Sequence, residues 1–431
     1  MGVVKNIFRS IIILVFLCLG CNKVAETPGA NPTTSAIRFY GNQYGNFLNS
    51  FAATQDGGYM FGGTTGTSDN NETQGFIQKC DKYGNILWCQ NYGGPHLDAF
   101  NVVHPTSDGG FIAAGATGSY GFGSTRKDYY NDAYLVKTDA NGKIVWQYPF
   151  GDIYEDRFYD VAETPDHGFV AVGIFSASTY SCTWVVKTDP NGKSEWKKQF
   201  YATDSSYYSL GAAVTVAPNG DIAVAGCIPK STAAINLGKQ YPTFILLSSL
   251  GKPYGLQTSI DTFPQYKDWG YMIGGTPFNY ETTYSIEKII SRSDGYIFAI
   301  NLAETIPNSI MIFKVDYQGN VLWHQQYFGL KSYAFLNDIS NNSAGGLLIS
   351  GGTTDQAGHS YCWLINTDAN GKEIWESTLP VNGYNAWAAG VVSTGNSFAL
   401  GINLISTDAK HIDYFSFLNI DQSGKIIEKN K

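Results

Sequence analysis

The sequence lacks several features that mark common enzymes and nucleic-acid-binding proteins. It has 28 lysine and arginine residues but no run of them, and its net charge of −8 is spread thinly. Clustered cations neutralise nucleic-acid phosphates, so we expect no nucleic-acid partner. No GxSxG, HExxH or phosphate-loop pattern occurs, and the six histidines show no metal-ligand spacing. We therefore expect no metal and no cofactor.

Cysteine is scarce and irregularly placed. Two of the seven cysteines, Cys18 and Cys21, lie near the N-terminus, and no CxxC pair occurs. An odd number of remaining cysteines at wide spacing is not typical of a disulfide framework. We expect most of them to be buried as small apolar side chains, and their pairing stays open. These five are Cys80, Cys89, Cys182, Cys227 and Cys362.

The residues that are abundant favour β-structure. The 431 residues include 48 Gly, 29 Tyr, 25 Phe and 9 Trp, but only 4 Met. Aromatic residues punctuated by glycine are typical of strands joined by tight turns. The length suits two or three ordinary domains or one large repetitive domain.

The first twenty residues have the pattern of a targeting segment. Lys5 and Arg9 precede a short apolar run from Ile11 to Leu19, which is too short to span a bilayer comfortably. The run ends in "LCLGC", where Gly20 directly precedes Cys21. One interpretation is an ordinary secretory signal in which the cysteine occurs by chance.

The interpretation that we favour is a lipid anchor, because the "LCLGC" stretch resembles the lipobox of bacterial lipoproteins, in which the final cysteine becomes lipidated. Cys18 departs from it, because the family usually has leucine at that position. The resemblance implies a diacylglycerol on the Cys21 thiol and an acyl chain, such as palmitate, on its amine. Several acyl chains together anchor a protein stably.

Three segments are therefore expected. Residues 1–20 are a lipoprotein signal peptide, residues 21–35 are the lipidated cysteine and a flexible polar tether, and residues 36–431 are the folded body. We expect the protein in the bacterial cell envelope, anchored to the outer membrane. Asn22 does not look like the familiar inner-membrane retention signal, and the leaflet stays open between periplasmic and surface.

The expected folded body contains a repeated sequence pattern. "TDANGKIVW" has an Asp, a Gly three residues later and a Trp four residues after that, and such copies recur 50 to 68 residues apart. Five copies are complete: Asp81-Gly84-Trp88, Asp139-Gly142-Trp146, Asp189-Gly192-Trp196, Asp316-Gly319-Trp323 and Asp368-Gly371-Trp375. Two degenerate copies, Ser248-Gly251-Gly255 and Asp421-Gly424-Glu428, bring the number of units to seven.

A second phrase precedes each copy, as in "DGGFIAAG" from Asp108. Each unit then reads as strand, turn, strand, variable loop, strand, turn, strand. Four strands in each of seven units predict an all-β, seven-bladed β-propeller of four-stranded antiparallel blades. "AIRFYGNQYGN" (Ala36 to Asn46) resembles the ends of other units, so we expect the N-terminal strand to pair with the C-terminal one and close the ring.

The repeated phrase is expected to be structural. The Asp139 carboxylate can accept backbone N–H groups two residues on, and Gly142 supplies a positive φ. Trp146 follows on the last strand, where its ring can fill the wedge between blades. An active site needs its aspartate once, whereas this one recurs in six of the seven turns.

These phrases resemble those of bacterial and archaeal extracytoplasmic repeat proteins built on "T-x-DGG-[YF]" and "K-x-D-x-x-G-x-x-x-W". The resemblance covers about Ala36 to the C-terminus and implies secreted or lipid-anchored propellers; it transfers no catalytic residue. A more distant likeness is to quinoprotein-type propellers. Their cofactor-binding arginine, aspartate and vicinal cysteines are not found in this sequence, so no quinone is expected.

Propeller topology places the uniform turns on one face and the variable loops on the other. Long loops that exceed what a connection needs often carry binding sites, and exposed aromatic residues are efficient anchors. Alternatively, these side chains pack against their own loops or plug the channel. The candidate contact residues are Tyr120, Phe122, Arg126, Tyr129, Tyr130, Tyr266, Trp269, Tyr271 and Tyr280.

Asp98 and Asp156 occupy equivalent places, ten residues before Asp108 and Asp166 of the second phrase. We expect them to cap turns rather than form a glycosidase pair. The predicted function is a binding or scaffolding module for protein partners in the cell envelope, more in keeping with a non-enzyme. The alternative is a propeller that binds or processes glycans through its aromatic loop face; a glycan hydrolase would need two convergent carboxylates about 5 to 10 Å apart.

Overall fold

The computed structural model describes residues 38–427, apart from residues 43, 68–71, 123–130, 179, 201–209, 229–240, 255–283, 303–308, 330–332 and 408–412. The proposed signal peptide, Cys21 and the tether lie outside the described residues. Within the described residues, no helix is long and apolar enough to cross a membrane.

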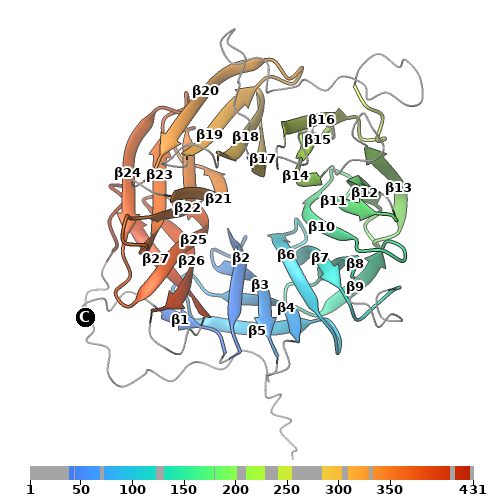
Figure 1. The fold of residues 1–431 in the computed structure, drawn as a ribbon, viewed down its shortest axis with the longest axis horizontal. Coiled ribbons are helices and arrows are strands. Elements are labelled where there is room, and N and C mark those ends of the chain that lie inside the picture. Colours follow the sequence, from blue (N-terminus) through green and yellow to red (C-terminus); the bar gives the residue numbers. More distant parts are fainter. Residues whose placement is uncertain are drawn as a thin grey trace, which may run out of the picture.

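The described chain forms seven antiparallel sheets, or blades, arranged in chain order around a central axis (Figure 1). Blades 1 to 3 contain β2 (Asn46–Ala53), β3 (Tyr59–Gly66), β4 (Thr73–Cys80), β5 (Ile86–Tyr92); β6 (Asp98–Pro105), β7 (Phe111–Thr117), β8 (Asp132–Thr138), β9 (Ile144–Phe150); and β10 (Arg157–Glu163), β11 (Phe169–Ser176), β12 (Ser181–Thr188), β13 (Ser194–Phe200).

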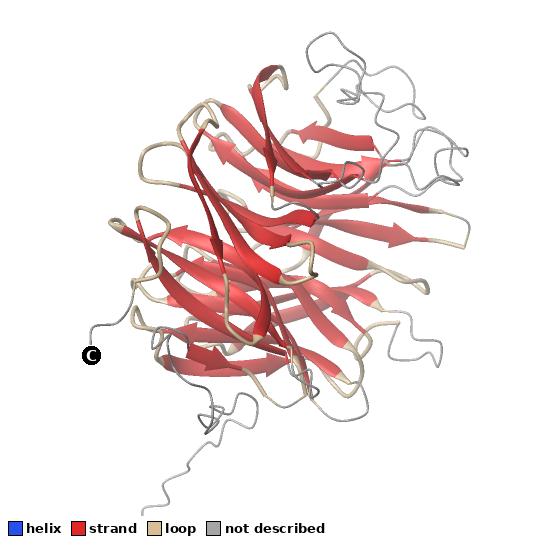
Figure 2. Ribbon diagram, turned by 60° about the vertical axis from the view of Figure 1, so that its left-hand side comes forward, coloured by secondary structure: helices blue, strands red, loops and turns tan. Residues whose placement is uncertain are grey.

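Blades 4 to 7 complete the ring. They contain β14 (Leu210–Val216), β15 (Ile222–Ile228), β16 (Tyr241–Leu247); β17 (Tyr284–Arg292), β18 (Gly295–Leu302), β19 (Ser309–Val315), β20 (Val321–Phe328); β21 (Tyr333–Asn341), β22 (Leu347–Thr354), β23 (Ser360–Thr367), β24 (Glu373–Leu379); and β25 (Tyr384–Ser393), β26 (Ser397–Ser406), β27 (Asp413–Asp421) with β1 (Arg38–Tyr40). The predicted seven-bladed propeller is confirmed. Figure 2 shows that the regular elements of the described residues are strands throughout.

Blade 4 differs from the others in the described residues, because its sheet contains three strands. A bridge between Leu247 and Pro253 continues the pattern for a short distance beyond β16. Residues 255–283, which follow, lie outside the described part of the chain.

Each blade begins at the centre of the ring and ends at its perimeter, so its connections alternate between two faces. We call the face that carries the first-to-second and third-to-fourth turns the turn face, and the opposite one the loop face. Turn-face connections between named strands span five residues or fewer, such as Thr54–Gly58. The connections on the loop face vary in length, from residues 177–180 to residues 118–131. The predicted division between uniform and variable faces is confirmed.

The repeated Asp-Gly phrase forms the turn between the third and fourth strands. Oδ1 of Asp139 accepts hydrogen bonds from the backbone N–H groups of Asn141 (2.8 Å) and Lys143 (2.9 Å). Gly142 has a φ of +78°, which favours glycine. The same paired acceptance occurs at Asp81, Asp189, Asp316, Asp368 and Asp421. These aspartates hold turns, as predicted.

The repeated tryptophan packs against the next blade. A Cβ atom on Gly142 would lie 2.7 Å from the ring of Trp88, which belongs to the preceding blade. The turn glycine is therefore required for clearance as well as for its φ. Equivalent contacts join Gly192 to Trp146, Gly251 to Trp196, Gly371 to Trp323 and Gly424 to Trp375. The expectation that these rings fill the wedges between blades is confirmed.

A buried lysine joins the two turns of a blade. Nζ of Lys137, on the third strand, lies 2.8 Å from Oδ2 of Asp108 in the first turn. Its aliphatic stem is buried while the ammonium reaches the exposed carboxylate. Lys79–Asp56, Lys187–Asp166 and Lys314–Asp294 repeat the pair.

The hydrophobic core lies between neighbouring blades. Ile112 and Leu135 of blade 2, for example, cluster with Phe158, Phe169 and Trp184 of blade 3. Burial of each such side chain contributes about 1.5–3 kcal/mol. Three cysteines, Cys80, Cys182 and Cys362, are free and buried, in agreement with the expected apolar role.

The two ends of the described chain share the outer strand of blade 7. Arg38 to Tyr40 pair with Phe417 to Phe415 on β27. Farther along β27, Ile426 bridges to Ile420 from the other end of the chain. The predicted closure by N- and C-terminal strands is confirmed, and β1 supplies only three residues to it.

Candidate functional site

The candidate functional site lies in the central channel. The side chains that form it are positioned by an irregularity that recurs in the innermost strands. In each of the seven, the pairing register shifts by one residue at the equivalent position. Such β-bulges bend a strand and re-aim a side chain. The extra residues are Asn49, Asn101, Tyr159, Ala212, Glu287, Asn337 and Ala389.

Three of the bulge residues are asparagines that connect neighbouring blades. Nδ2 of Asn49 donates to the carbonyl oxygen of Phe100 (2.7 Å), and Nδ2 of Asn101 donates to that of Phe158 (2.6 Å). Nδ2 of Asn337 donates to the carbonyl oxygen of Ala388 at 2.8 Å. Each amide is thereby held at the channel wall.

The residue after the bulge makes a second connection between blades. Oγ of Ser50 accepts the backbone N–H of Val103 at 2.8 Å, and Oδ2 of Asp160 accepts that of Val214 at 2.9 Å. The channel wall is thus held in place by side-chain to backbone hydrogen bonds from one blade to the next, so the groups that face the axis are pre-positioned.

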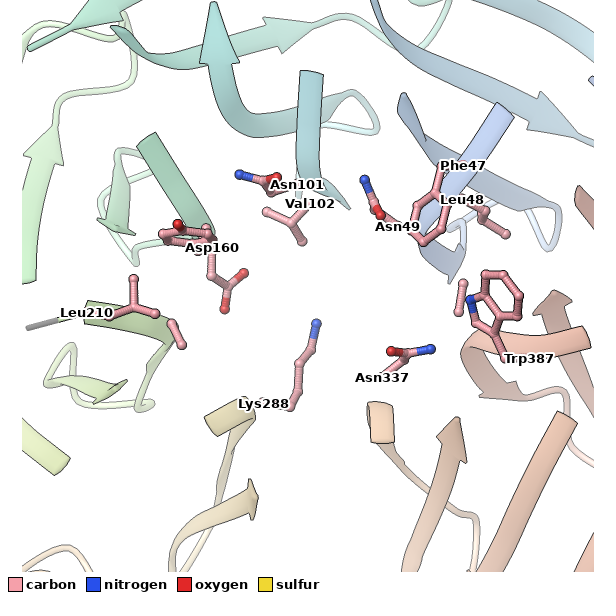
Figure 3. Close-up of a pocket in the computed structure, with 13 residues that line it drawn as sticks. Phe47, Leu48, Asn49, Asn101, Val102, Asp160, Leu210, Lys288, Asn337 and Trp387 are labelled. Carbon is pink, nitrogen blue, oxygen red and sulfur yellow. The ribbon is translucent and has the colours of Figure 1, made fainter. Parts of the chain in front are cut away.

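These strands enclose a cavity of about 390 Å³ on the axis of the ring. Every innermost strand contributes to its lining. Figure 3 shows the side chains of Asp160 and Lys288 pointing into the cavity, with Asn49, Asn101 and Asn337 around it. The volume falls within the range of small-molecule sites, about 300–1,000 Å³.

Aromatic side chains stand at the loop-face end of the cavity, where β2 and β25 begin. Phe47 is 47% exposed, although it lines the cavity. Its ring centroid lies 5.9 Å from that of Trp387, with an angle of 45° between the rings. The two side chains form an apolar surface beside the polar channel groups (Figure 3).

Four titratable side chains meet around the channel. Nε2 of His104 is hydrogen bonded to Oδ1 of Asp160 at 3.1 Å. Nζ of Lys288, on β17, lies 3.6 Å from Oδ1 of Asp338, on β21. The two carboxylates are nearly buried, with side-chain exposures of 7% for Asp160 and 14% for Asp338.

The two carboxyl groups differ in acidity. Burial alone would raise the pKa of Asp160, but the hydrogen bond from His104 and the charge of Lys288 outweigh it and lower the pKa. Burial raises the pKa of Asp338, and the charge of Lys288 only partly opposes this rise. Asp160 is therefore the firmly ionised member of the pair.

The predicted contact residues are divided between described and undescribed segments. Tyr120 is half-buried, donates a hydrogen bond to the carbonyl oxygen of Gly93 and packs on Tyr134, so it contacts its own surroundings. Phe122 is 54% exposed on the loop face. The other seven lie outside the described residues: Arg126, Tyr129, Tyr130, Tyr266, Trp269, Tyr271 and Tyr280.

Asp98 and Asp156 cap loop-face turns, as expected. Oδ2 of Asp98 accepts the backbone N–H of Gly94 at 2.7 Å. Asp156 accepts the N–H groups of Asp152 and Ser176, each at 2.9 Å. Neither carboxylate lines the cavity. Among the described residues, no three or more His, Cys, Asp or Glu side chains are arranged to hold a metal ion.

Sequence reasoning missed the channel residues. One signal was present, because Asn recurs inside the first strand of three units, at Asn49, Asn101 and Asn337. Asparagine is disfavoured within strands, so its repetition at one position marks a bulge or a polar contact. Lys288 comes from a single unit, so no comparable signal identified it; Asp160 shares its position after the bulge with Asp338.

No protein-family profile matches the chain, and no curated protein matches it in sequence. Solved structures do resemble it. An ulvan lyase of a polysaccharide lyase family, PL25, bound to a GlcA(1-4)Rha3S saccharide, is 9% identical with a TM-score of 0.55, over 90% of this chain and 97% of that one. The polysaccharide lyase Uly1 is 10% identical with a TM-score of 0.52, over 92% and 94% of the two chains.

The β-propeller domain of the Trilobed protease from Pyrococcus furiosus is 8% identical with a TM-score of 0.46, over 90% of this chain and 96% of that one. At such identities a likeness shows the fold alone, and the propeller fold of this chain rests on the seven sheets described above. No activity is transferred from these structures.

Proposed function

We propose that this protein is a binding propeller, anchored in the bacterial envelope through a lipid on Cys21, that takes a saccharide unit into the loop-face end of its central channel. The observation that supports this proposal is the cavity, in which the aromatic surface of Phe47 and Trp387 lies beside asparagine amides held by hydrogen bonds. A sugar ring offers apolar C–H faces and hydroxyl groups that both donate and accept. Aromatic rings pack against the C–H faces, and amide groups form hydrogen bonds with the hydroxyl groups.

The channel chemistry supports binding more than catalysis. Hydrolysis of a glycosidic bond needs two carboxyl groups that flank it. Of the carboxylates in the described residues, only Asp160 lines the cavity. It is committed to His104 and to the backbone of Val214, and its lowered pKa does not suit a general acid.

The test is calorimetric titration of the full chain, solubilised in detergent, with sugars selected from an oligosaccharide array. Trp387→Ala is expected to weaken binding at least about tenfold, because it removes half of the aromatic surface. Phe328→Ala is the matched control, since Phe328 is exposed on the loop face at the end of an outer strand. Binding of no sugar, or equal losses in both variants, would contradict the proposal.

The anchor is tested separately. Cys21→Ser is expected to move the protein from the membrane fraction to the soluble fraction, because the thiol that carries the diacylglycerol is absent. A variant that stays in the membrane fraction would refute lipidation at this residue and leave the channel site unaffected.

A protein-scaffolding role is the second candidate, and a different observation favours it. Large apolar side chains are exposed around the loop face: Tyr44, Leu97, Phe122, Ile153, Phe328 and Tyr333. Exposed apolar patches often mark protein-binding surfaces. A photo-crosslinker is placed at Phe122 and activated in intact cells. Reproducible capture of one partner protein, and loss of that partner when Ile153→Ser is added, would favour scaffolding.

A further inference from the structure

The charges around the channel restrict which saccharides it can take. Lys288 supplies the only cation among the residues that line the cavity in the described part of the chain. Its ammonium is 3.6 Å from Asp338, and its charge also lowers the pKa of Asp160. The cation is therefore shared between two carboxylates that come from opposite sides of the ring.

Among the described residues around the channel, two carboxyl groups, Asp160 and Asp338, meet one ammonium group, that of Lys288. When Asp338 is ionised, the negative charges of this group exceed its single positive charge. Near-buried charges are poorly screened, so a second anion that entered the cavity would be repelled by both carboxylates.

An anionic sugar that pairs with the Lys288 ammonium would compete with Asp338 for it. The Asp338 side chain is 14% exposed, and the backbone N–H of Val391 lies as far as 3.4 Å from its Oδ2. Loss of one partner from a near-buried ion pair is strongly unfavourable, because it leaves the other charge uncompensated.

A neutral sugar meets none of these costs. The asparagines use Nδ2 to hold the neighbouring blade, as Asn49 does with Phe100 at 2.7 Å, which leaves the amide oxygen for a ligand. Within the described residues no hydrogen bond reaches the side-chain oxygens of Asn49, Asn101 or Asn337. Hydroxyl groups can donate to these oxygens and to Asp160 without disturbing the ion pair.

We infer that the channel selects uncharged, hydroxyl-rich saccharides and rejects sugars that carry a carboxylate or sulfate group. This inference rests on the proposed saccharide site and specifies its ligand class. Lys288 and Asp338 together determine this selectivity. Lys288 lines the cavity and faces the ligand, whereas Asp338 lies outside the lining and pairs with the Lys288 ammonium.

The experiment uses the tightest-binding neutral oligosaccharide and the same oligosaccharide with one primary hydroxyl oxidised to the carboxylate. Both are titrated into the full-length protein in detergent by calorimetry at one pH and salt concentration. We expect the carboxylate form to bind at least about tenfold more weakly, equivalent to about 1.4 kcal/mol. Asp338→Asn should narrow that ratio, because it removes one of the repelling charges and frees Lys288 to pair with the ligand.

Asp294→Asn is the matched control, because it makes the same change of charge beside Lys314, at the turn face rather than in the channel. It should leave the ratio unchanged. The inference is overturned if wild type binds the carboxylate form as tightly as the neutral form or more tightly. It is also overturned if Asp338→Asn leaves the affinity ratio unchanged. In either case the proposed saccharide site still stands. Binding of neither sugar overturns both proposals.

Discussion

The two faces of this propeller follow opposite rules, although the same strands run between them. On the turn face, the Asp-Gly turn and the Lys–Asp pair recur from blade to blade with nearly the same geometry. On the loop face, the connections between second and third strands vary from residues 177–180 to residues 118–131, and the exposed side chains differ between blades. Repetition on one face holds the ring together, and variation on the other is free to specify a ligand. Four changes test this contrast.

The largest effect is expected at a turn glycine. Gly142→Val should destabilise the protein by about 4 kcal/mol, because it combines a strained positive φ with overlap of the Trp88 ring. The measurement is the free energy of unfolding from denaturant titration. Gly109→Val is the control, since Gly109 has a similar φ of +83° but a Cβ atom added there would have no neighbour within 4 Å; it should cost about 2 kcal/mol. Equal costs would show that the Trp88 contact contributes nothing.

The second effect is a pH dependence that distinguishes the faces. Burial raises the pKa of Asp156, on the loop face, to about 7; the charges of Asp152 and Asp132 add to this, and backbone hydrogen bonds from Ser176 and Asp152 oppose it. The folded state therefore binds the proton more tightly than the unfolded state, so this group should lower stability as pH rises from about 4 to 7. Asp156→Asn should remove that decrease, of about 2 kcal/mol, in unfolding titrations at pH 5 and pH 8. A variant with the same pH slope as wild type would contradict the assignment.

The third effect concerns the turn face and has the opposite sign. Burial opposes ionisation of Asp108, but hydrogen bonds from Lys137 and Thr106 outweigh it and lower its pKa to about 2. Its contribution is present above the unfolded pKa of about 4 and is lost as pH falls towards 2. Lys137→Met should cost about 1 kcal/mol at pH 7, and the difference from wild type should shrink below pH 3. A constant difference at all pH values would attribute the loss to packing alone.

The smallest effect is expected at an exposed loop-face residue. Phe122→Ser should change the free energy of unfolding by less than about 0.5 kcal/mol, because the ring is 54% exposed. Thermal unfolding would measure this. A loss above about 1 kcal/mol would show that the loop face is structural here too, and would weaken the contrast between the faces.

The turn face could be predicted from the sequence because its chemistry is local and repeated. Asp139, Gly142 and their neighbours form hydrogen bonds within five residues, and seven units provide seven readings of the same pattern. Trp146 could also be predicted, since a large ring at a fixed distance from each turn has only the neighbouring blade to fill. The ring closure followed from the resemblance of the N-terminal stretch to the ends of other units.

The channel could not be predicted in the same way. Asp160, Lys288 and Asp338 come from three different blades, on β10, β17 and β21, and Figure 3 shows Asp160 and Lys288 extending into the cavity from separate strands. Their proximity depends on ring closure and on bulges that shift each innermost strand by one residue. A single-residue shift moves a side chain to the other side of a strand, and hydrophobic alternation alone does not reveal it.

The closure of blade 7 has a mechanical consequence. Any pull on the chain that precedes Arg38, such as the proposed lipid anchor at Cys21 would transmit, is delivered first to the three residues of β1. Their resistance includes the pairing with β27 and two side-chain hydrogen bonds to blade 1, from Tyr40 Oη to the carbonyl oxygen of Gly84 and from Arg38 Nη1 to Oδ1 of Asn85. These contacts reach into blade 1, so the load is shared between the last and the first blade. The seam of the ring is thus also the point where the protein would bear force.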